Sequence, residues 1–234
     1  VLQGAGDHFC PGGNVYRIHT EPTSLEAVAR TAIDLFDGFC QLRCLPMAVL
    51  CAVQGTVLGG GLAICLLTDF VTSDHAATFQ VGERSRGIYP AGLLRQTLSD
   101  AIGPAAAMDL YLAEDKITAT RAWAIELVPA VASSARAAQQ SAYRLAHCHA
   151  TSAGGADTAL LSDLWLLRGE LPSSERLMLA VDAFAQARSL QALASGGGTH
   201  VPEVVFASGS KLSRGSIRRA VQAAVFRAGR DLQH

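Results

Sequence analysis

Two apolar segments that break on glycine constrain the fold of this chain more than any other feature. Residues 8–14 read H-F-C-P-G-G-N, and residues 53–65 read V-Q-G-T-V-L-G-G-G-L-A-I-C, followed by T-D-F at 68–70. Each begins as a strand-like run, and the second passes from its glycines into a helix-like run. Glycine leaves backbone N–H groups accessible, and a helix start adds a positive dipole end. Two such breaks that converge would form an oxyanion hole.

Four ordered motifs resemble those of the crotonase superfamily, the enoyl-CoA hydratase/isomerase family. The first two are the glycine segments. The third, A-T-F-Q-V-G-E-R-S-R-G-I-Y-P at residues 77–90, is similar to the family's A-x-F-x-x-P-E-x-x-x-G-x-x-P. The fourth, L-A-E-D-K-I-T-A at 112–119 with Ala122 and Leu127-Val128, resembles L-T-G-x-x-I-x-A-x-x-A-x-x-x-G-L-V. Four motifs in the family's order are strong evidence for the family, but they are weaker evidence for a particular reaction within it.

The resemblance implies an α/β fold, a crotonase-like spiral of β-β-α units with a C-terminal helical region. We expect an incomplete spiral core at residues 1–130, a helical region at 131–195 and a basic tail or appendage at 196–234. The chain opens within a strand, and the hairpin, strand and helix that the family places earlier are missing from it. A fragment, a domain of a larger synthase and a gene model without its start all fit this beginning.

Hydrophobic periodicity predicts the individual elements. Helices are expected at residues 25–43, 60–67, 104–111, 118–126, 135–147, 160–168 and 174–193, and buried strands at 47–53 and 70–73. Thr23 and Glu26 have the spacing of a capping box at the start of the first helix. Pro46 is expected to end that segment.

The resemblance assigns the oxyanion donors, position by position, to the backbone N–H groups of Gly13 and Gly60. Both would bond the carbonyl oxygen of a thioester. Hydratases of the family use two glutamates, and Ala63 stands at the first of these positions while Glu83 occupies the second. Alanine cannot transfer a proton, but one carboxylate can remove a proton at one carbon and return it at another. The family's Δ3,Δ2-enoyl isomerases resemble this pattern.

An alternative role for Glu83 is open at this point. Arg84 and Arg86 flank it, and Gly82 stands where the family usually has proline. A neighbouring guanidinium favours a structural ion pair in which the pKa of the carboxyl is lowered and its basicity is poor.

Three further side chains are candidates for substrate binding. Tyr16 and His19 follow the first glycine pair, where the resemblance places groups that select the reaction, and Tyr89 precedes Pro90 in the third motif. Tyrosine would donate a hydrogen bond to the acyl group, and histidine would act as an acid or base near neutral pH. The alternative is that these side chains are only solvated.

Composition excludes several classes of function. The net charge of −1 argues against a general nucleic-acid binder, although the end of the chain is basic and an acidic partner would suit it. No apolar run reaches the roughly 18 residues of a membrane span, and no secretory signal is visible. The six cysteines are irregularly spaced and predict buried thiols in a reducing compartment, so we expect a cytoplasmic protein. Neighbours in a helix cannot chelate together, so His147-Cys148-His149 predicts no metal site.

These features predict an enzyme that acts on an acyl thioester through a stabilised enolate, giving double-bond isomerisation or hydration/dehydration. No separate cofactor is expected, because coenzyme A or the phosphopantetheine arm of an acyl carrier protein belongs to the substrate. Decarboxylation of a carboxy-acyl thioester in polyketide β-branching is one alternative, and a degenerate homologue that only binds is another. Half of the residues are hydrophobic, which favours a homo-oligomer, a trimer or a dimer of trimers by the resemblance.

Overall fold

The computed structural model describes residues 1–13, 24–45, 47–90 and 92–152. The strands are β1 (Leu2–Gln3), β2 (Leu50–Val53), β3 (Thr56–Leu58), β4 (Phe70–Asp74), β5 (Thr78–Gln80), β6 (Ile117–Thr118) and β7 (Ala130–Ala132). The helices are α2 (Leu25–Cys44), α3 (Gly60–Leu66), α4 (Leu94–Ala113), α5 (Ala119–Ala124) and α6 (Ala135–Ser152), with a 3₁₀ turn η1 (Arg84–Arg86).

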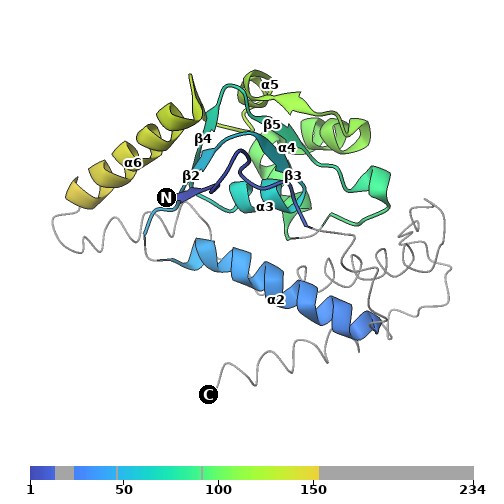
Figure 1. Cartoon of the computed structure of the whole chain (residues 1–234). Helices are drawn as coiled ribbons and strands as arrows, with labels where there is room; N and C mark the ends of the chain where they lie inside the picture. The colour runs from blue at the N-terminus through green and yellow to red at the C-terminus, as the bar shows by residue number, and fades with distance from the viewer. Residues whose placement is uncertain (14–23, 46, 91, 153–234) are drawn as a thin grey trace, which may run out of the picture.

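The strands form two small sheets that arise from a repeated unit. β1, β2, β4 and β7 make one parallel sheet in that order, and β3, β5 and β6 make a second sheet. β4 pairs with β2 and β5 pairs with β3, both in parallel, so the unit β4–β5–α4 stacks on the unit β2–β3–α3. Figure 1 shows the sheets at the centre, with α6 beside one of them and α4 and α5 on the other side. The predicted spiral of β-β-α units is confirmed.

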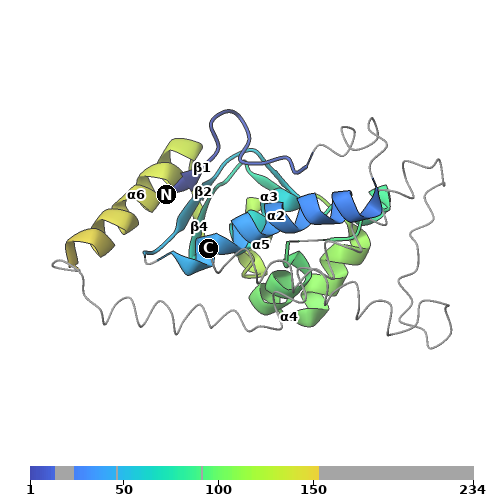
Figure 2. The ribbon, with the colours of Figure 1, turned by 90° about the horizontal axis from the view of Figure 1, so that it is seen from below.

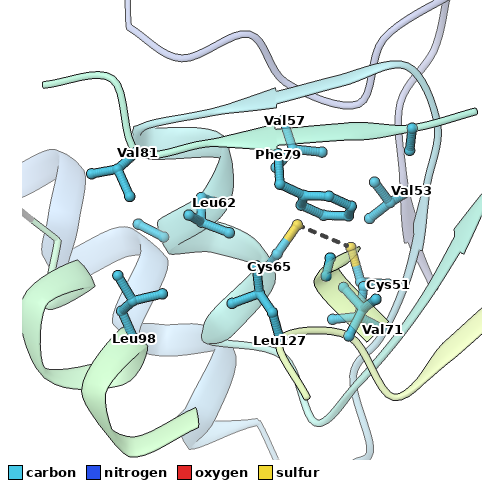
Figure 3. Close-up of a cluster of buried hydrophobic side chains, with 14 of the residues drawn as sticks. Cys51, Val53, Val57, Leu62, Cys65, Val71, Phe79, Val81, Leu98 and Leu127 are labelled. Carbon is cyan, nitrogen blue, oxygen red and sulfur yellow. Dashed lines mark hydrogen bonds between the residues drawn. The ribbon is translucent and has the colours of Figure 1, made fainter. Parts of the chain in front are cut away.

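The main core lies between the sheets, α3 and α4. Side chains from β2, β3, β5, α3 and α4 converge there, as Figure 3 shows. The cluster includes Val53, Val57, Leu62, Phe79 and Leu98, each at most 4% exposed. All four residues of β2 are buried, which explains its continuous apolar sequence.

The opposite face of the parallel sheet is covered by α6. Ala138 and Ala142 are both fully buried, and Ala142 packs with Leu50 and Ala52 of β2. Residues four apart lie on one face of a helix, so these small side chains let α6 approach the sheet closely. Tyr143 on the same helix is exposed.

The long helix α2 lies beneath α3, and Figure 2 shows it in front of the strands. Phe36 and Cys40 of α2 form a second buried cluster with Leu67 and Leu93. The N-cap is Ser24, whose hydroxyl accepts from the N–H of Ala27 at 3.3 Å. The helix therefore begins one residue later than a cap at Thr23 would place it.

Two of the differences between predicted and observed boundaries have a physical cause in the structure. β2 begins at Leu50 rather than at residue 47, because Val49 is held by Asp69 instead: its N–H donates to Oδ2 of Asp69 at 2.6 Å. The helix predicted at 104–111 is the second part of α4, which begins at Leu94 and kinks at Gly103, where φ is 78°. A Gly-Pro pair resembles a helix start, and here it marks a kink within one element.

The thiols are less uniformly buried than predicted. Cys40, Cys51 and Cys65 are buried and Cys10 is half-buried, but Cys148 is exposed near the end of α6. The Sγ atoms of Cys51 and Cys65 lie 3.9 Å apart in the main core. The prediction of a buried thiol is therefore wrong for Cys148.

Several predictions lie outside the described residues. These are the helices at 160–168 and 174–193, the tail at 196–234, and most of the helical region at 131–195, of which α6 is the described part. Among the helices that the structure describes, none is both long enough and apolar enough to cross a bilayer.

Candidate active site

The first glycine segment runs alongside β3. Cys10 pairs in parallel with Val57, donates its N–H to the carbonyl oxygen of Thr56 at 3.3 Å and accepts from the N–H of Leu58 at 3.1 Å. Parallel segments end at the same edge of a sheet. The glycines that follow Cys10 and those that follow Leu58 therefore lie at one edge.

The side chain of Gln54 fixes the loop that leads into this segment. Its amide donates to the carbonyl oxygens of Gly4 at 3.0 Å and Gly6 at 2.8 Å. Its own carbonyl oxygen accepts from the N–H of Phe9 at 2.8 Å. Gln54 belongs to the second glycine segment, so one segment positions the other.

The two glycine breaks approach each other closely. A methyl group on Gly12 would lie 2.9 Å from the carbonyl oxygen of Leu58, and one on Gly61 would collide with the carbonyl oxygen of Cys10. Only a residue without Cβ fits at Gly61. The N–H groups of Gly13 and Gly60 donate to no acceptor within the described part of the chain. Two unengaged donors near one edge suit an oxyanion hole, and the assignment to Gly13 and Gly60 stays a prediction.

The carboxyl group of Glu83 lies against the glycine break that begins α3. Gly59 precedes the helix with φ of 53°, and a methyl group there would lie 2.7 Å from Oε1 of Glu83. Glu83 is 8% exposed, and its carbonyl oxygen accepts from the N–H of Ile88 at 2.9 Å. Its Oε2 is buried and has no hydrogen-bond partner among the described residues. The structure thus brings Glu83 to the residue next to Gly60.

Burial controls the ionisation of Glu83. Desolvation raises its pKa to about 8, although its own backbone hydrogen bond and the charge of Arg86 lower it. Arg84 donates to the carbonyl oxygen of Leu112 at 3.0 Å, and Arg86 donates to that of Gly82 at 3.3 Å. The alternative of an ion-paired Glu83 with a lowered pKa is wrong, because burial outweighs Arg86 and both guanidiniums bind backbone oxygens.

The position of the missing glutamate is closed and apolar. Ala63 of α3 is fully buried, and its N–H donates to the carbonyl oxygen of Gly59 at 3.0 Å. A methyl group on Gly92 would lie 3.6 Å from Cβ of Ala63 and 2.8 Å from the ring of Phe36. A water molecule needs two to four polar partners, which alanine and a phenyl ring do not provide.

Sequence reasoning missed Glu114 and Tyr111, which lie at the end of α4 near Glu83. Oε2 of Glu114 accepts from the N–H of Ser85 at 2.7 Å, and its Oε1 is buried without a partner among the described residues. Burial raises the pKa of Tyr111, and the charges of Glu114 and Glu83 raise it further. The available signal was the fourth motif, in which Glu114 stands where the family pattern has glycine.

Of the three predicted substrate-binding residues, the structure describes only Tyr89. Tyr89 is half-buried and follows Ile88, whose N–H binds the backbone of Glu83. Its role toward a substrate stays a prediction. Tyr16 and His19 lie outside the described residues, so their predicted roles are not tested.

The chain is similar to known proteins in sequence and in fold. The sequence profile of the family Enoyl-CoA hydratase/isomerase matches residues 1–164. The bacillaene synthase dehydratase PksH of Bacillus subtilis is 32% identical over 94 residues, which cover 40% of this chain and 36% of that protein. The chain therefore spans about a third of the length of that curated relative.

Solved structures agree with this match. An enoyl-CoA hydratase from Polaromonas sp. JS666 is 28% identical, with a TM-score of 0.63 over 83% of this chain and 74% of that chain. An enoyl-CoA hydratase from Bacillus halodurans has a TM-score of 0.70 at 15% identity, over 94% of this chain and 79% of that chain, which shows the fold. The chain belongs to the enoyl-CoA hydratase/isomerase family and has the crotonase fold.

Proposed function

We propose that this chain forms the enolate of an acyl thioester and moves a double bond, with Glu83 as the proton-transfer group. The observation that carries this proposal is the carboxyl group of Glu83, buried against Gly59 with Oε2 unpartnered among the described residues. Its pKa of about 8 suits a group that must both accept and release a proton near neutral pH. The N–H groups of Gly13 and Gly60 are the proposed donors to the thioester oxygen.

The proposed reaction has two proton transfers. Ionised Glu83 takes the proton from Cα of a 3-enoyl thioester, and the electron pair of that C–H bond moves toward the carbonyl oxygen, which becomes negative. The two glycine donors stabilise this oxygen, and each such donor is typically worth about 2.7–4 kcal/mol in the transition state. Protonated Glu83 then returns the proton to the γ-carbon, and a 2-enoyl thioester results.

A turnover assay tests this function. Purified protein is incubated with 3-enoyl, 2-enoyl, 3-hydroxyacyl and carboxy-acyl thioesters of coenzyme A, and the conjugated 2-enoyl product is followed by absorbance. Conversion of the 3-enoyl thioester to the 2-enoyl thioester supports the proposal. Tight binding with no turnover of any substrate would indicate a degenerate homologue, and release of carbon dioxide would indicate a decarboxylase.

Dehydration is a second candidate, favoured by the similarity to the bacillaene synthase dehydratase. A single carboxyl group serves this reaction too: it takes the Cα proton of a 3-hydroxyacyl thioester and delivers that proton to the departing hydroxyl, which leaves as water. In this case the phosphopantetheine arm of an acyl carrier protein is the proposed carrier. Faster turnover of a carrier-bound than of a coenzyme A-bound 3-hydroxyacyl thioester would support it.

We also propose that the protein is a homo-oligomer, most simply a trimer or a dimer of trimers. Three large apolar side chains on α4 and α5 are more than half exposed, namely Met108, Leu112 and Trp123. Exposed apolar surface of this kind often marks an interface. Light scattering on the whole chain at micromolar concentration tests this, and a mass of one chain would refute it.

A further inference from the structure

The backbone and side chain of Glu114 connect α4 to the turn that carries Glu83. Glu114 ends α4 in the left-handed region, with φ of 52°, and its carbonyl oxygen accepts from the side-chain amide of Gln80 at 2.8 Å. Its Oε2 accepts from the N–H of Ser85, two residues beyond Glu83, at 2.7 Å. A left-handed conformation is strained for a residue with Cβ, so glycine would be easier to place here.

Glu114 and Glu83 belong to a small cluster of titratable groups that influence one another electrostatically. Oε1 of Glu114 and Oε2 of Glu83 are both buried and unpartnered among the described residues. Burial is the main cause of the raised pKa of Glu83; the charge of Glu114 adds to it, and that of Arg86 acts to lower it. Tyr111 on α4 faces the same groups together with Arg84. The carboxyl group of Glu83 also lies against Gly59, the uncharged N-cap residue of α3.

We propose that Glu114 is a positioning residue for Glu83, which fixes the turn after Glu83 and holds a second negative charge beside it. It acts through Glu83: its hydrogen bond with the N–H of Ser85 sets the turn, and its charge adds to the burial that favours the protonated form of Glu83. This inference rests on the proposed function of Glu83 and specifies its regulation.

The test compares substitutions that separate the two effects. Glu114→Gln keeps an oxygen that accepts from Ser85 and removes the charge, whereas Glu114→Gly removes both and relieves the left-handed strain. Glu126→Gln is the matched control, because Glu126 is exposed, follows α5 and also has a positive φ, 65°. Circular dichroism and thermal unfolding check that each variant folds. If Glu114→Gln does not fold, Glu114→Gly replaces it in the measurements.

Two readouts are used on the full chain. Infrared difference spectra against Glu83→Gln isolate the protonated carboxyl band of Glu83, so its titration midpoint is measured without any turnover. The pH profile of kcat/KM for the 3-enoyl thioester is recorded in parallel. In Glu114→Gln both midpoints should fall by a few tenths of a pH unit, because burial rather than the charge of Glu114 is the main cause of the raised pKa of Glu83. Glu126→Gln should leave both unchanged.

An unchanged Glu83 midpoint in both Glu114 variants would overturn the proposal, and so would an equal shift in Glu126→Gln. If no variant turns over any thioester while the infrared midpoint still falls in Glu114→Gln, the function proposed for Glu83 fails but its control by Glu114 stands. If turnover is present and only kcat changes, with neither midpoint moving, Glu114 is merely structural and the proposal is refuted.

Discussion

Glu83 and Ala63 both contact Gly59, yet one residue provides a carboxyl group there and the other only a methyl group. The Glu83 carboxyl rests on Gly59, and the backbone N–H of Ala63 binds the carbonyl oxygen of that same residue. One position keeps a buried carboxyl whose pKa is raised to about 8, while the other holds the fully buried methyl group of Ala63. The difference is consistent with the proposal that Glu83 alone transfers the proton.

Glu83→Gln should give the largest effect, because it removes the carboxyl group that lies against Gly59 and is the proposed proton-transfer group. Turnover of the 3-enoyl thioester should fall by about 10³-fold, in the range usual for loss of a general acid–base group. Thioester binding, measured by calorimetry, should change little. Near-normal turnover would mean that another group, such as Tyr16 or His19, transfers the proton.

Ala63→Glu tests the other position. Its carboxyl would enter an apolar, fully buried place beside Phe36, so the free energy of unfolding should fall by about 3 kcal/mol, and hydration of a 2-enoyl thioester should not appear. Ala105→Glu, at an exposed position of α4, should cost far less. A stable Ala63→Glu protein that hydrates its substrate would show that the position can hold a catalytic carboxylate after all.

The raised pKa of Glu83 also predicts how stability depends on pH. The folded state holds this proton more tightly than the unfolded state, so its stabilisation is full below the unfolded pKa and is lost as pH rises through about 8. Glu83→Gln has no such proton to lose. Relative to the unsubstituted protein, it should gain about 4 kcal/mol of unfolding free energy between about pH 5 and about pH 9. A pH-independent difference, measured by denaturant titration, would contradict the buried carboxyl.

Arg86→Gln should give the smallest effect, and in the opposite direction to Glu114→Gln. The charge of Arg86 lowers the pKa of Glu83, so its removal should shift the rising limb of kcat/KM to higher pH by a few tenths of a unit. The shift is small because Arg86 is exposed and screened by solvent. Arg121→Gln, an exposed change on α5, is the control. A shift to lower pH would mean that Arg86 acts on another group.

Much of the fold follows from local patterns in the sequence. The apolar periodicity of residues 25–43 predicts α2 closely, and the glycine break at 59–61 predicts the start of α3. The first part of α4 was missed because Gly103-Pro104 resembles a helix start, although the chain continues through a kink there. Local signals fail where a boundary depends on a distant residue, as Asp69 does for the start of β2.

The site was harder to predict than the fold, for the same reason. The sequence places Arg84 and Arg86 next to Glu83, but it does not show that both guanidiniums turn to backbone oxygens. Nor does it show the contact between Glu114 and Ser85, which are 29 residues apart. The motifs locate Glu83, whereas its pKa depends on burial that only the assembled fold creates.

The thiols of Cys51 and Cys65, which lie together in the core, can be used to measure local opening of α3. Burial raises the pKa of Cys65 well above its ordinary value, and Cys51 adds to this, so the reactive thiolate is scarce while α3 stays packed. Alkylation of Cys65 therefore requires a local opening of α3, whereas the exposed Cys148 needs none. The rate of alkylation at Cys65, with and without a bound thioester, then measures how much the substrate stabilises α3 against local opening.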